Sequence, residues 1–175
     1  MRNYYLRVLS GLWLLLLLGG CAGMPAVPTA TTDYDHGYNF SSVHNIAIQP
    51  ISRDTVSTVM ISDEQISRID QALIAELQRR GFQVVTVNAD ADIFLSWQLV
   101  TRESAQVTIA DGATQQAVQG TLFVNMIDPV MLRSVWRARF ESRLRDRPES
   151  DAAAQFRQEA AEVILAQFPP AQGAR

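Results

Sequence analysis

Residues 121–144, TLFVNMIDPVMLRSVWRARFESRL, decide the fold of this chain. Two largely apolar segments, 121–127 and 134–144, flank an Asp128-Pro129 pair that is typical of a turn. They predict two adjacent antiparallel strands, in which successive side chains point to opposite faces of the sheet. In the second strand one face carries Trp136, Ala138 and Phe140, and the other carries Arg137, Arg139, Glu141 and Arg143. The predicted sheet therefore has an apolar face and a charged face.

Upstream of this pair, residues 62–81 predict an amphipathic helix. Ser62 and Gln65 match the S-x-x-Q capping box at its start, and Gly81 occupies the position after its end that favours glycine. Four apolar residues at helical spacing form the expected buried face: Ile66, Ile69, Leu73 and Leu77.

A second helix is predicted near the end of the chain, over residues 150–167. Pro169 and Pro170 end it, because proline lacks the backbone N–H that a helix needs. Its expected buried stripe is Phe156, Ala160, Val163, Ile164 and Phe168.

Four further strands are predicted, over residues 43–49, 82–87, 93–100 and 106–109. The third of them alternates apolar and other residues from Ile93 to Val100, and the fourth precedes an Asp111-Gly112 turn. Two helices with one apolar stripe each can cover only one face of such a sheet. The predicted fold class is therefore α/β (α+β): a two-layer sandwich with a mixed, mostly antiparallel sheet of about six strands and two helices on one face.

Composition limits the function classes that this chain can serve. Its 175 residues suit one domain, 47% of them are hydrophobic, and its formal net charge is −3. A general nucleic-acid binder carries a strongly basic balance, so nucleic acid is excluded as a partner. All 15 cationic residues are Arg, and the single Cys excludes an intrachain disulfide.

The first 20 residues are typical of a secretory signal peptide. Arg2 and Arg7 precede an apolar run over residues 8–18, which is too short to cross a bilayer as a helix. Gly19 and Gly20 supply the small residues that a signal peptidase requires. An uncleaved N-terminal anchor is the alternative interpretation.

The sequence Leu18-Gly19-Gly20-Cys21 resembles the bacterial lipobox. The resemblance implies that Cys21 is diacylated, that residues 1–20 are removed, and that the new amino group is acylated. Ala22, in place of an Asp after the Cys, implies the outer membrane, facing the periplasm. The expected organisation is a signal peptide (1–20), a lipidated Cys with a flexible tether (21–32), one periplasmic domain (33–170) and a frayed tail (171–175).

Motifs that carry chemistry are missing from the sequence. It has no G-x-G-x-x-G, no Walker loop and no G-x-S-x-G, so we predict no catalytic residue and no cofactor. His36 and His44 are interpreted as structural or solvated, and Asp33, Asp35 and His36 as polar residues where the domain begins rather than as a metal site. Asp90, Asp92 and Asp128 are interpreted as turn residues.

The most suggestive feature is the density of arginine, six residues between 133 and 147. Arg137, Arg139 and Arg143 share the face expected to be open. One interpretation is a surface that binds anions, such as lipid phosphates or an acidic envelope protein. The other is a solvated face whose charge is offset by Glu141, Asp146 and Glu149. Phe94, Val100 and Phe123 are expected to lie on the same face.

Several segments together resemble the bacterial lipoprotein domain known as domain-of-unknown-function family 4136, over residues 33–170. They are Asp33-Tyr34-Asp35, Asn39-Phe40-Ser41, Ala91-Asp92-Ile93, Gly120-Thr121-Leu122, Val135-Trp136-Arg137 and Ile164-Leu165-Ala166-Gln167-Phe168-Pro169-Pro170. The turn at residues 128–133 departs from the family because it lacks a small, Gly-containing centre. The resemblance implies the fold and an envelope location but no catalytic residue.

Three functions are therefore considered. The leading hypothesis is a non-enzymatic, membrane-anchored binding or envelope-maintenance module. The alternatives are an envelope hydrolase with an unrecognised active site and a lipoprotein with a structural role.

Overall fold

The computed structural model describes residues 29–51, 62–103, 107–108, 114–115, 118–144 and 150–171. Its main sheet has six strands: β1 (Ala30–Tyr34), β2 (Asn45–Ile48), β3 (Gln83–Val85), β4 (Ile93–Glu103), β7 (Val118–Asp128) and β8 (Arg133–Leu144). Their order across the sheet is β1-β8-β7-β4-β2-β3. The pairs β2–β3 and β2–β4 are parallel and the others antiparallel, so the sheet is mixed.

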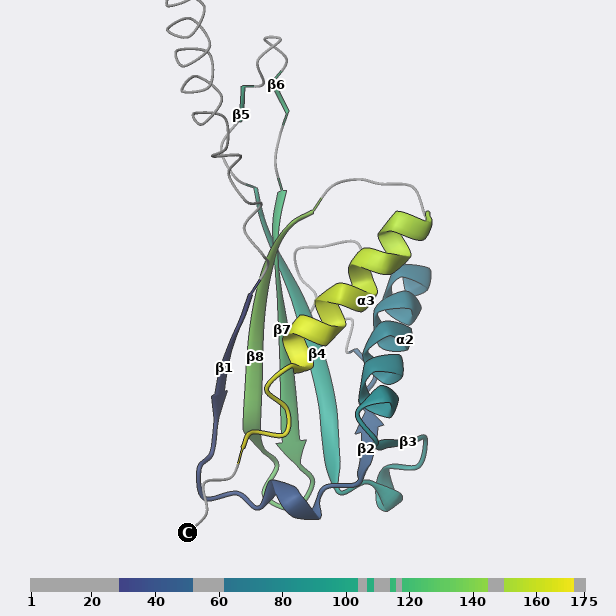
Figure 1. Cartoon of the computed structure of the whole chain (residues 1–175), viewed down its shortest axis with the longest axis vertical. Coiled ribbons are helices and arrows are strands. Elements are labelled where there is room, and N and C mark those ends of the chain that lie inside the picture. The colour runs from purple at the N-terminus through teal and green to yellow at the C-terminus, as the bar shows by residue number, and fades with distance from the viewer. Residues whose placement is uncertain are drawn as a thin grey trace, which may run out of the picture.

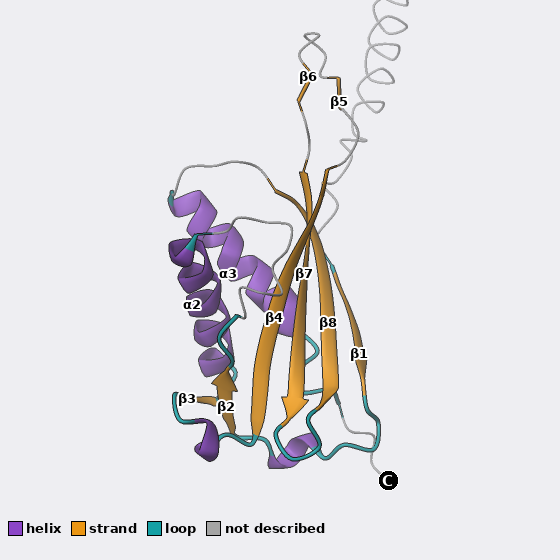
Figure 2. Ribbon diagram, turned by 180° about the vertical axis from the view of Figure 1, so that it is seen from behind, coloured by secondary structure: helices purple, strands orange, loops and turns teal. Residues whose placement is uncertain are grey.

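Two long helices, α2 (Asp63–Arg79) and α3 (Asp151–Leu165), cover one face of the sheet (Figure 1). Seen from behind, the long strands β4, β7 and β8 have no helix in front of them (Figure 2). The predicted α+β sandwich with both helices on one face is confirmed.

The core lies between the helices and the sheet. Leu73 and Leu77 of α2 and Ile164 and Leu165 of α3 are each no more than 1% exposed. They contact a layer of buried strand residues: Ile46, Ile93, Leu95, Trp97, Val124, Met126, Trp136, Ala138 and Phe140. Burying each large apolar side chain contributes about 1.5–3 kcal/mol, which makes this layer the main source of stability.

Helix α2 begins and ends where the sequence predicts. Ser62 Oγ accepts a hydrogen bond from the backbone N–H of Gln65 at 3.2 Å, and Gln65 Oε1 accepts one from the Ser62 N–H at 2.9 Å, so the capping box is complete. Gly81 has φ +91°, a conformation that strains residues with a Cβ. The helix therefore ends at the sequence signals that delimit it.

Helix α3 differs from its predicted stripe. Phe156 is 40% exposed, whereas Ala161, Ile164 and Leu165 are buried and Phe168 is buried just after the helix. The buried residues of α3 all lie in its C-terminal half, so Phe156, in the first half of the helix, does not reach the core.

The strands also differ in detail from the prediction. Strand β1 was not predicted, and it occupies residues 30–32 of the expected tether. The predicted strand at residues 106–109 is reduced to β5 (Val107–Thr108), which pairs with β6 (Thr114–Gln115) in a separate two-stranded sheet. The expected turn at Asp111-Gly112 lies outside the described residues.

The β7–β8 hairpin contains a bulge. Met126 lies opposite Trp136 but Ile127 lies opposite Ser134, so Val135 is an extra residue in β8. Val135 and Trp136 are both buried, at 1% exposure each, and strict alternation resumes from Arg137 to Phe140. The bulge thus determines which residues of β8 alternate towards solvent, and Arg137 and Arg139 are among them.

Candidate functional site

The open face of the sheet is the surface opposite α2 and α3, formed by β1, β8, β7 and β4 (Figure 2). Backbone register places its side chains in rows across the strands. One row runs Asp33, Arg137, Asn125 and Ser96, and the next runs Thr31, Arg139, Phe123 and Gln98. Two predicted arginines therefore lie at the centre of this face, as neighbours along β8.

Arg137 and Arg139 have different electrostatic surroundings. Arg137 Nε donates to the neutral Oδ1 of Asn125 at 2.8 Å. Among the ion pairs of the described residues none involves Arg137, although Asp33 lies opposite it in register. Arg139 donates instead to the carboxylate of Glu141, an exposed pair that contributes little to stability. Within the described part of the chain, no carboxylate therefore lies at ion-pair distance from Arg137.

The third predicted arginine is placed only by its backbone. Arg143 lies in β8 opposite Gln119 of β7, at the alternation phase of Arg137 and Arg139, and its side chain is outside the described part.

Aromatic and aliphatic side chains share this face with the arginines. Phe123 lies directly opposite Arg139, and Phe94 and Phe123 are half-buried. Val100 is 40% exposed. The resulting mixture of cations and apolar rings is typical of surfaces that bind other molecules.

Three of the predicted aspartates lie at the turn end of the sheet, the end where β7 turns into β8, and two of them hold loops in place. Asp92 Oδ2 accepts the backbone N–H groups of His44 at 2.9 Å and Asn45 at 2.8 Å, and these bonds hold the pKa of Asp92 below its usual value. Asp128 Oδ1 accepts the N–H groups of Val130 at 2.8 Å and Met131 at 2.6 Å. Asp90 is exposed in a short turn at residues 88–90.

Asp35 and the histidines lie near the same end. The backbone N–H of Gly37, at 2.8 Å from Asp35 Oδ1, and the guanidinium of Arg133 lower the pKa of Asp35. The ring of exposed His36 lies 4.4 Å from that of Tyr34, and exposed His44 places Nδ1 3.0 Å from the Ser42 carbonyl oxygen. Within the described ranges no group of three or more His, Cys, Asp or Glu residues is arranged to hold a metal ion.

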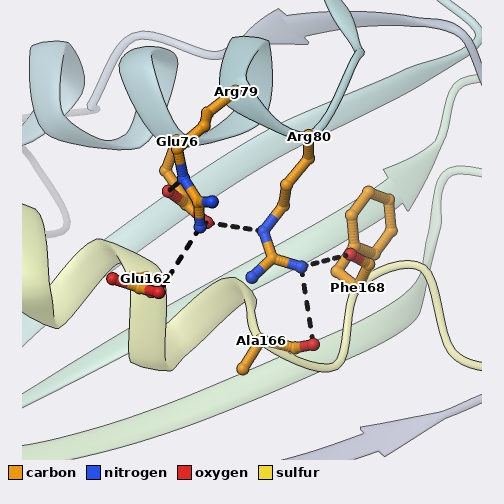
Figure 3. A network of polar contacts seen from close by, with 6 residues as sticks. All are labelled: Glu76, Arg79, Arg80, Glu162, Ala166 and Phe168. Atoms are coloured by element: carbon orange, nitrogen blue, oxygen red, sulfur yellow. Dashed lines mark hydrogen bonds and ion pairs between the residues drawn. The ribbon is translucent and has the colours of Figure 1, made fainter.

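Two partly buried polar contacts of α2 were not predicted. Glu76, fully buried on α2, accepts Arg79 Nε at 2.7 Å and Arg80 Nε at 2.6 Å. Arg80 Nη1 also donates to the carbonyl oxygens of Ala166 at 3.4 Å and Phe168 at 3.3 Å, which ties α2 to the end of α3 (Figure 3). Burial alone raises the pKa of Glu76, but the bonds from both arginines outweigh it and lower that pKa.

The other buried contact joins α2 to β4. Trp97 Nε1 donates to Asp70 Oδ1 at 2.7 Å, and Trp97 is 2% exposed. Burial raises the pKa of Asp70 although the indole bond opposes this. The sequence does carry a signal for both contacts, because the acidic residues Asp70 and Glu76 interrupt the buried side of an amphipathic helix. They position helices rather than a reacting group.

None of the helices in the described ranges has the length and apolar character that crossing a membrane requires. A search of curated proteins finds none with significant sequence similarity to this chain. A family model for a domain of unknown function, DUF4136, matches residues 30–170. The chain belongs to the DUF4136 family. The resemblance noted in the sequence is thereby confirmed, and the matched region begins at β1.

Solved structures with this fold include another DUF4136 protein, from Bacteroides thetaiotaomicron, at a TM-score of 0.51 and 14% identity. The match covers 82% of this chain and 95% of that one. PelC from Paraburkholderia phytofirmans, solved as a dodecamer, matches with a TM-score of 0.50 and 13% sequence identity. That match covers 79% of this chain and 95% of PelC. A PDZ domain protein from Parabacteroides distasonis matches with a TM-score of 0.55 and 12% sequence identity. The match covers 85% of this chain but only 36% of that protein. At these identities the likeness concerns the fold.

Proposed function

We propose that this DUF4136 protein is a lipid-anchored lipoprotein of the bacterial cell envelope whose open sheet face binds an anionic envelope component without catalysis. The observation that carries the binding role is Arg137, a cation at the centre of the sheet face opposite α2 and α3, with no described carboxylate at ion-pair distance. The anchoring role rests on Leu18-Gly19-Gly20-Cys21.

Cys21 is the proposed site of lipidation. Thioether formation there accounts for the only cysteine of a chain that enters an oxidising compartment. Each buried methylene of an acyl chain contributes about 0.8 kcal/mol, so two or three chains anchor the protein stably. Because Ala22 rather than Asp follows the Cys, we place the anchor in the outer membrane, with residues 33–170 in the periplasm.

Mass spectrometry of the N-terminal peptide from envelope-purified protein tests this anchor. The expected peptide begins at a triacylated Cys21, and Cys21→Ser abolishes the modification and moves the protein into the soluble fraction. An intact leader, or an unmodified thiol at residue 21, contradicts the proposal.

The open face is suited to phosphate or carboxylate groups. A guanidinium donates two parallel hydrogen bonds to such a group. Arg137 commits its Nε to Asn125, which fixes its orientation without cancelling its charge. Phe123, in the next row across β7, supplies apolar contact area. The binding function needs no reacting group, and the described carboxylates at the turn end accept backbone or arginine N–H groups instead.

Binding to anionic lipid vesicles tests this face, using a chain that begins at Ala22. We expect Arg137→Ser to weaken binding about tenfold or more, because a charge-assisted hydrogen bond is lost. Arg139→Ser has a smaller effect, since Glu141 already pairs with that residue. The matched control is Arg68→Ser, which removes the same charge from α2 at a residue whose ion-pair partner, Glu64, is exposed.

Two further results decide the ligand class. Binding that persists with purely zwitterionic vesicles and is unchanged in Arg137→Ser contradicts an anion-binding face. Loss of capture of an acidic envelope protein in the same variant, without any vesicle binding, assigns the face to a protein carboxylate surface.

A further inference from the structure

Strand β1 lies at one end of the six-stranded sheet, and among the described residues no strand pairs with its outer side (Figure 1). Its inner side pairs with β8, and this ladder continues to the hydrogen bond from Asp35 N to Val135 O at 2.8 Å. Antiparallel ladders alternate, so residues 31 and 33 also direct their backbone groups towards β8. The backbone N–H and C=O groups of Ala30, Thr32 and Tyr34 therefore point outward.

This edge lacks the features with which monomeric proteins block edge pairing. Its sequence Ala-Thr-Thr-Asp-Tyr contains no Pro, no Lys and a single charge, Asp33. Its side chains do not cover the edge either. Thr32 Oγ1 bonds Gln167 over the helix face, and the ring of Tyr34 contacts those of His36 and Phe40.

We propose that β1 is an interface strand through which two copies of this chain pair, antiparallel, about a two-fold axis at Thr32. This register places Thr32 opposite Thr32 of the second copy and Ala30 opposite Tyr34. All three outward residues then exchange backbone hydrogen bonds with the second copy. The two sheets join into one continuous sheet.

The side chains favour this register over its neighbours. It places Thr31 opposite Asp33 of the second copy, so that a hydroxyl donor meets a carboxylate, and it places small Ala30 opposite large Tyr34. A shift by one hydrogen-bonding step in one direction sets Asp33 against Asp33, and like charges directly opposite are destabilising. A shift in the other direction leaves only three residues paired. The self-complementarity of the strand is the reason for a second copy rather than another partner.

Site-specific crosslinking tests the register in the full-length chain in intact cells. Thr31→Cys and Asp33→Cys chains carrying different tags are co-expressed and treated with a mild thiol oxidant. Residues 31 and 33 of the two copies are expected about 4.5 Å apart between Cα atoms, within the range of a disulfide. Two residues 31, or two residues 33, lie about 8 Å apart, which is too far.

The expected result is a disulfide dimer in the mixed cells and little in cells that express either variant alone. Wild-type chain, with Cys21 as its only cysteine, is the control for background. Equal crosslinking by each variant alone, or crosslinking of residue 31 to a different protein, overturns the proposal. No crosslink in the mixed cells overturns it as well.

A proline at the axis provides a second test. Thr32→Pro, added to both cysteine chains, removes an outward N–H and leaves the β8 ladder intact, so the dimer yield falls by on the order of tenfold. Thr32→Val is the matched control, because it removes the bond to Gln167 but keeps the N–H. Circular dichroism and thermal melting confirm that each variant is folded. Unchanged yield in folded Thr32→Pro contradicts edge pairing.

Discussion

At the scale of single residues, the negative charge of Asp70 lowers the stability of the folded chain. Burial raises the pKa of this carboxyl, so its ionised form is less favourable in the folded chain than in the unfolded one. Stability contributed by its protonated form is therefore lost as pH rises through its folded pKa. The hydrogen bond that its Oδ1 accepts from Trp97 offsets part of this cost.

Two substitutions separate the charge of Asp70 from its hydrogen bond. Asp70→Asn keeps an oxygen acceptor for Trp97 and removes the charge, so we expect stability at pH 7 equal to or above wild type. Asp70→Ala leaves the buried indole N–H without an acceptor and lowers the free energy of unfolding by about 1–3 kcal/mol. Urea denaturation at pH 7 measures both. Equal destabilisation by the two variants would refute this account.

Sequence reasoning at this scale succeeded where a residue's role is local. Ser62, Gln65 and Gly81 act within one helical turn, so their roles follow from spacing. The partners of Asp70 and Arg137 come from other elements, and so does the Phe168 carbonyl that Arg80 contacts, so only the tertiary fold defines these contacts. The arginine face could be predicted from alternation, but the difference between Arg137 and Arg139 could not.

At the scale of elements, Arg80 connects the two helices. It pairs with fully buried Glu76 on α2 and donates to two carbonyl groups at the end of α3 (Figure 3). Carbonyl groups at a helix C-terminus lack partners within the helix, so this arginine acts as a cap supplied by the neighbouring helix.

Removing this connection should be costly. We expect Arg80→Gln to lower the free energy of unfolding by about 2–3 kcal/mol, because it removes one guanidinium from buried Glu76 and also the hydrogen bonds to the Ala166 and Phe168 carbonyls. Arg79→Gln is the matched control and has a smaller effect, since it also removes a guanidinium from Glu76, but Arg79 is 57% exposed and its contact with α3 is an ion pair with exposed Glu162 at 3.5 Å. Thermal unfolding of both variants measures the difference. Comparable losses in the two variants would show that the bridge to α3 contributes nothing.

The strands show why the edge of this sheet escaped prediction. Residues 121–127 are largely apolar and residues 134–144 alternate around an Asp128-Pro129 turn, so their pairing could be inferred from sequence. Residues 30–34 combine Ala, two Thr and Asp, and their extended form depends on pairing with β8, more than 100 residues away. The bulge at Val135 likewise depends on how β8 meets β7. Long-range pairing, rather than local propensity, decides both features.

At the scale of the whole molecule, the proposed dimer and the proposed binding face reinforce each other. A two-fold axis through paired edge strands is perpendicular to the joined sheet, so both open faces lie on the same side. The two Arg137 residues then face one target together. Two linked sites raise avidity through effective concentration without any new contact.

Acid sensitivity is a property of the whole domain, because depressed carboxyl pKa values in three separate segments of the chain act in the same direction. Two backbone N–H groups lower the pKa of Asp92, and the Gly37 N–H together with Arg133 lowers the pKa of Asp35. Hydrogen bonds from Arg79 and Arg80 lower the pKa of buried Glu76. A depressed pKa gives stability that is fully present above the unfolded value and is lost as pH falls through the folded one. We therefore expect a constant urea midpoint from pH 7 to 5 and a fall below about pH 4. Asp70, with its raised pKa, opposes this fall only in part.

Asp92→Asn is the decisive variant, because its side-chain oxygen still accepts the N–H groups of His44 and Asn45 but no longer titrates. Its midpoint should lie below wild type at pH 7 and change less on acidification, and a wild-type midpoint that stays flat down to pH 3 would refute the linkage.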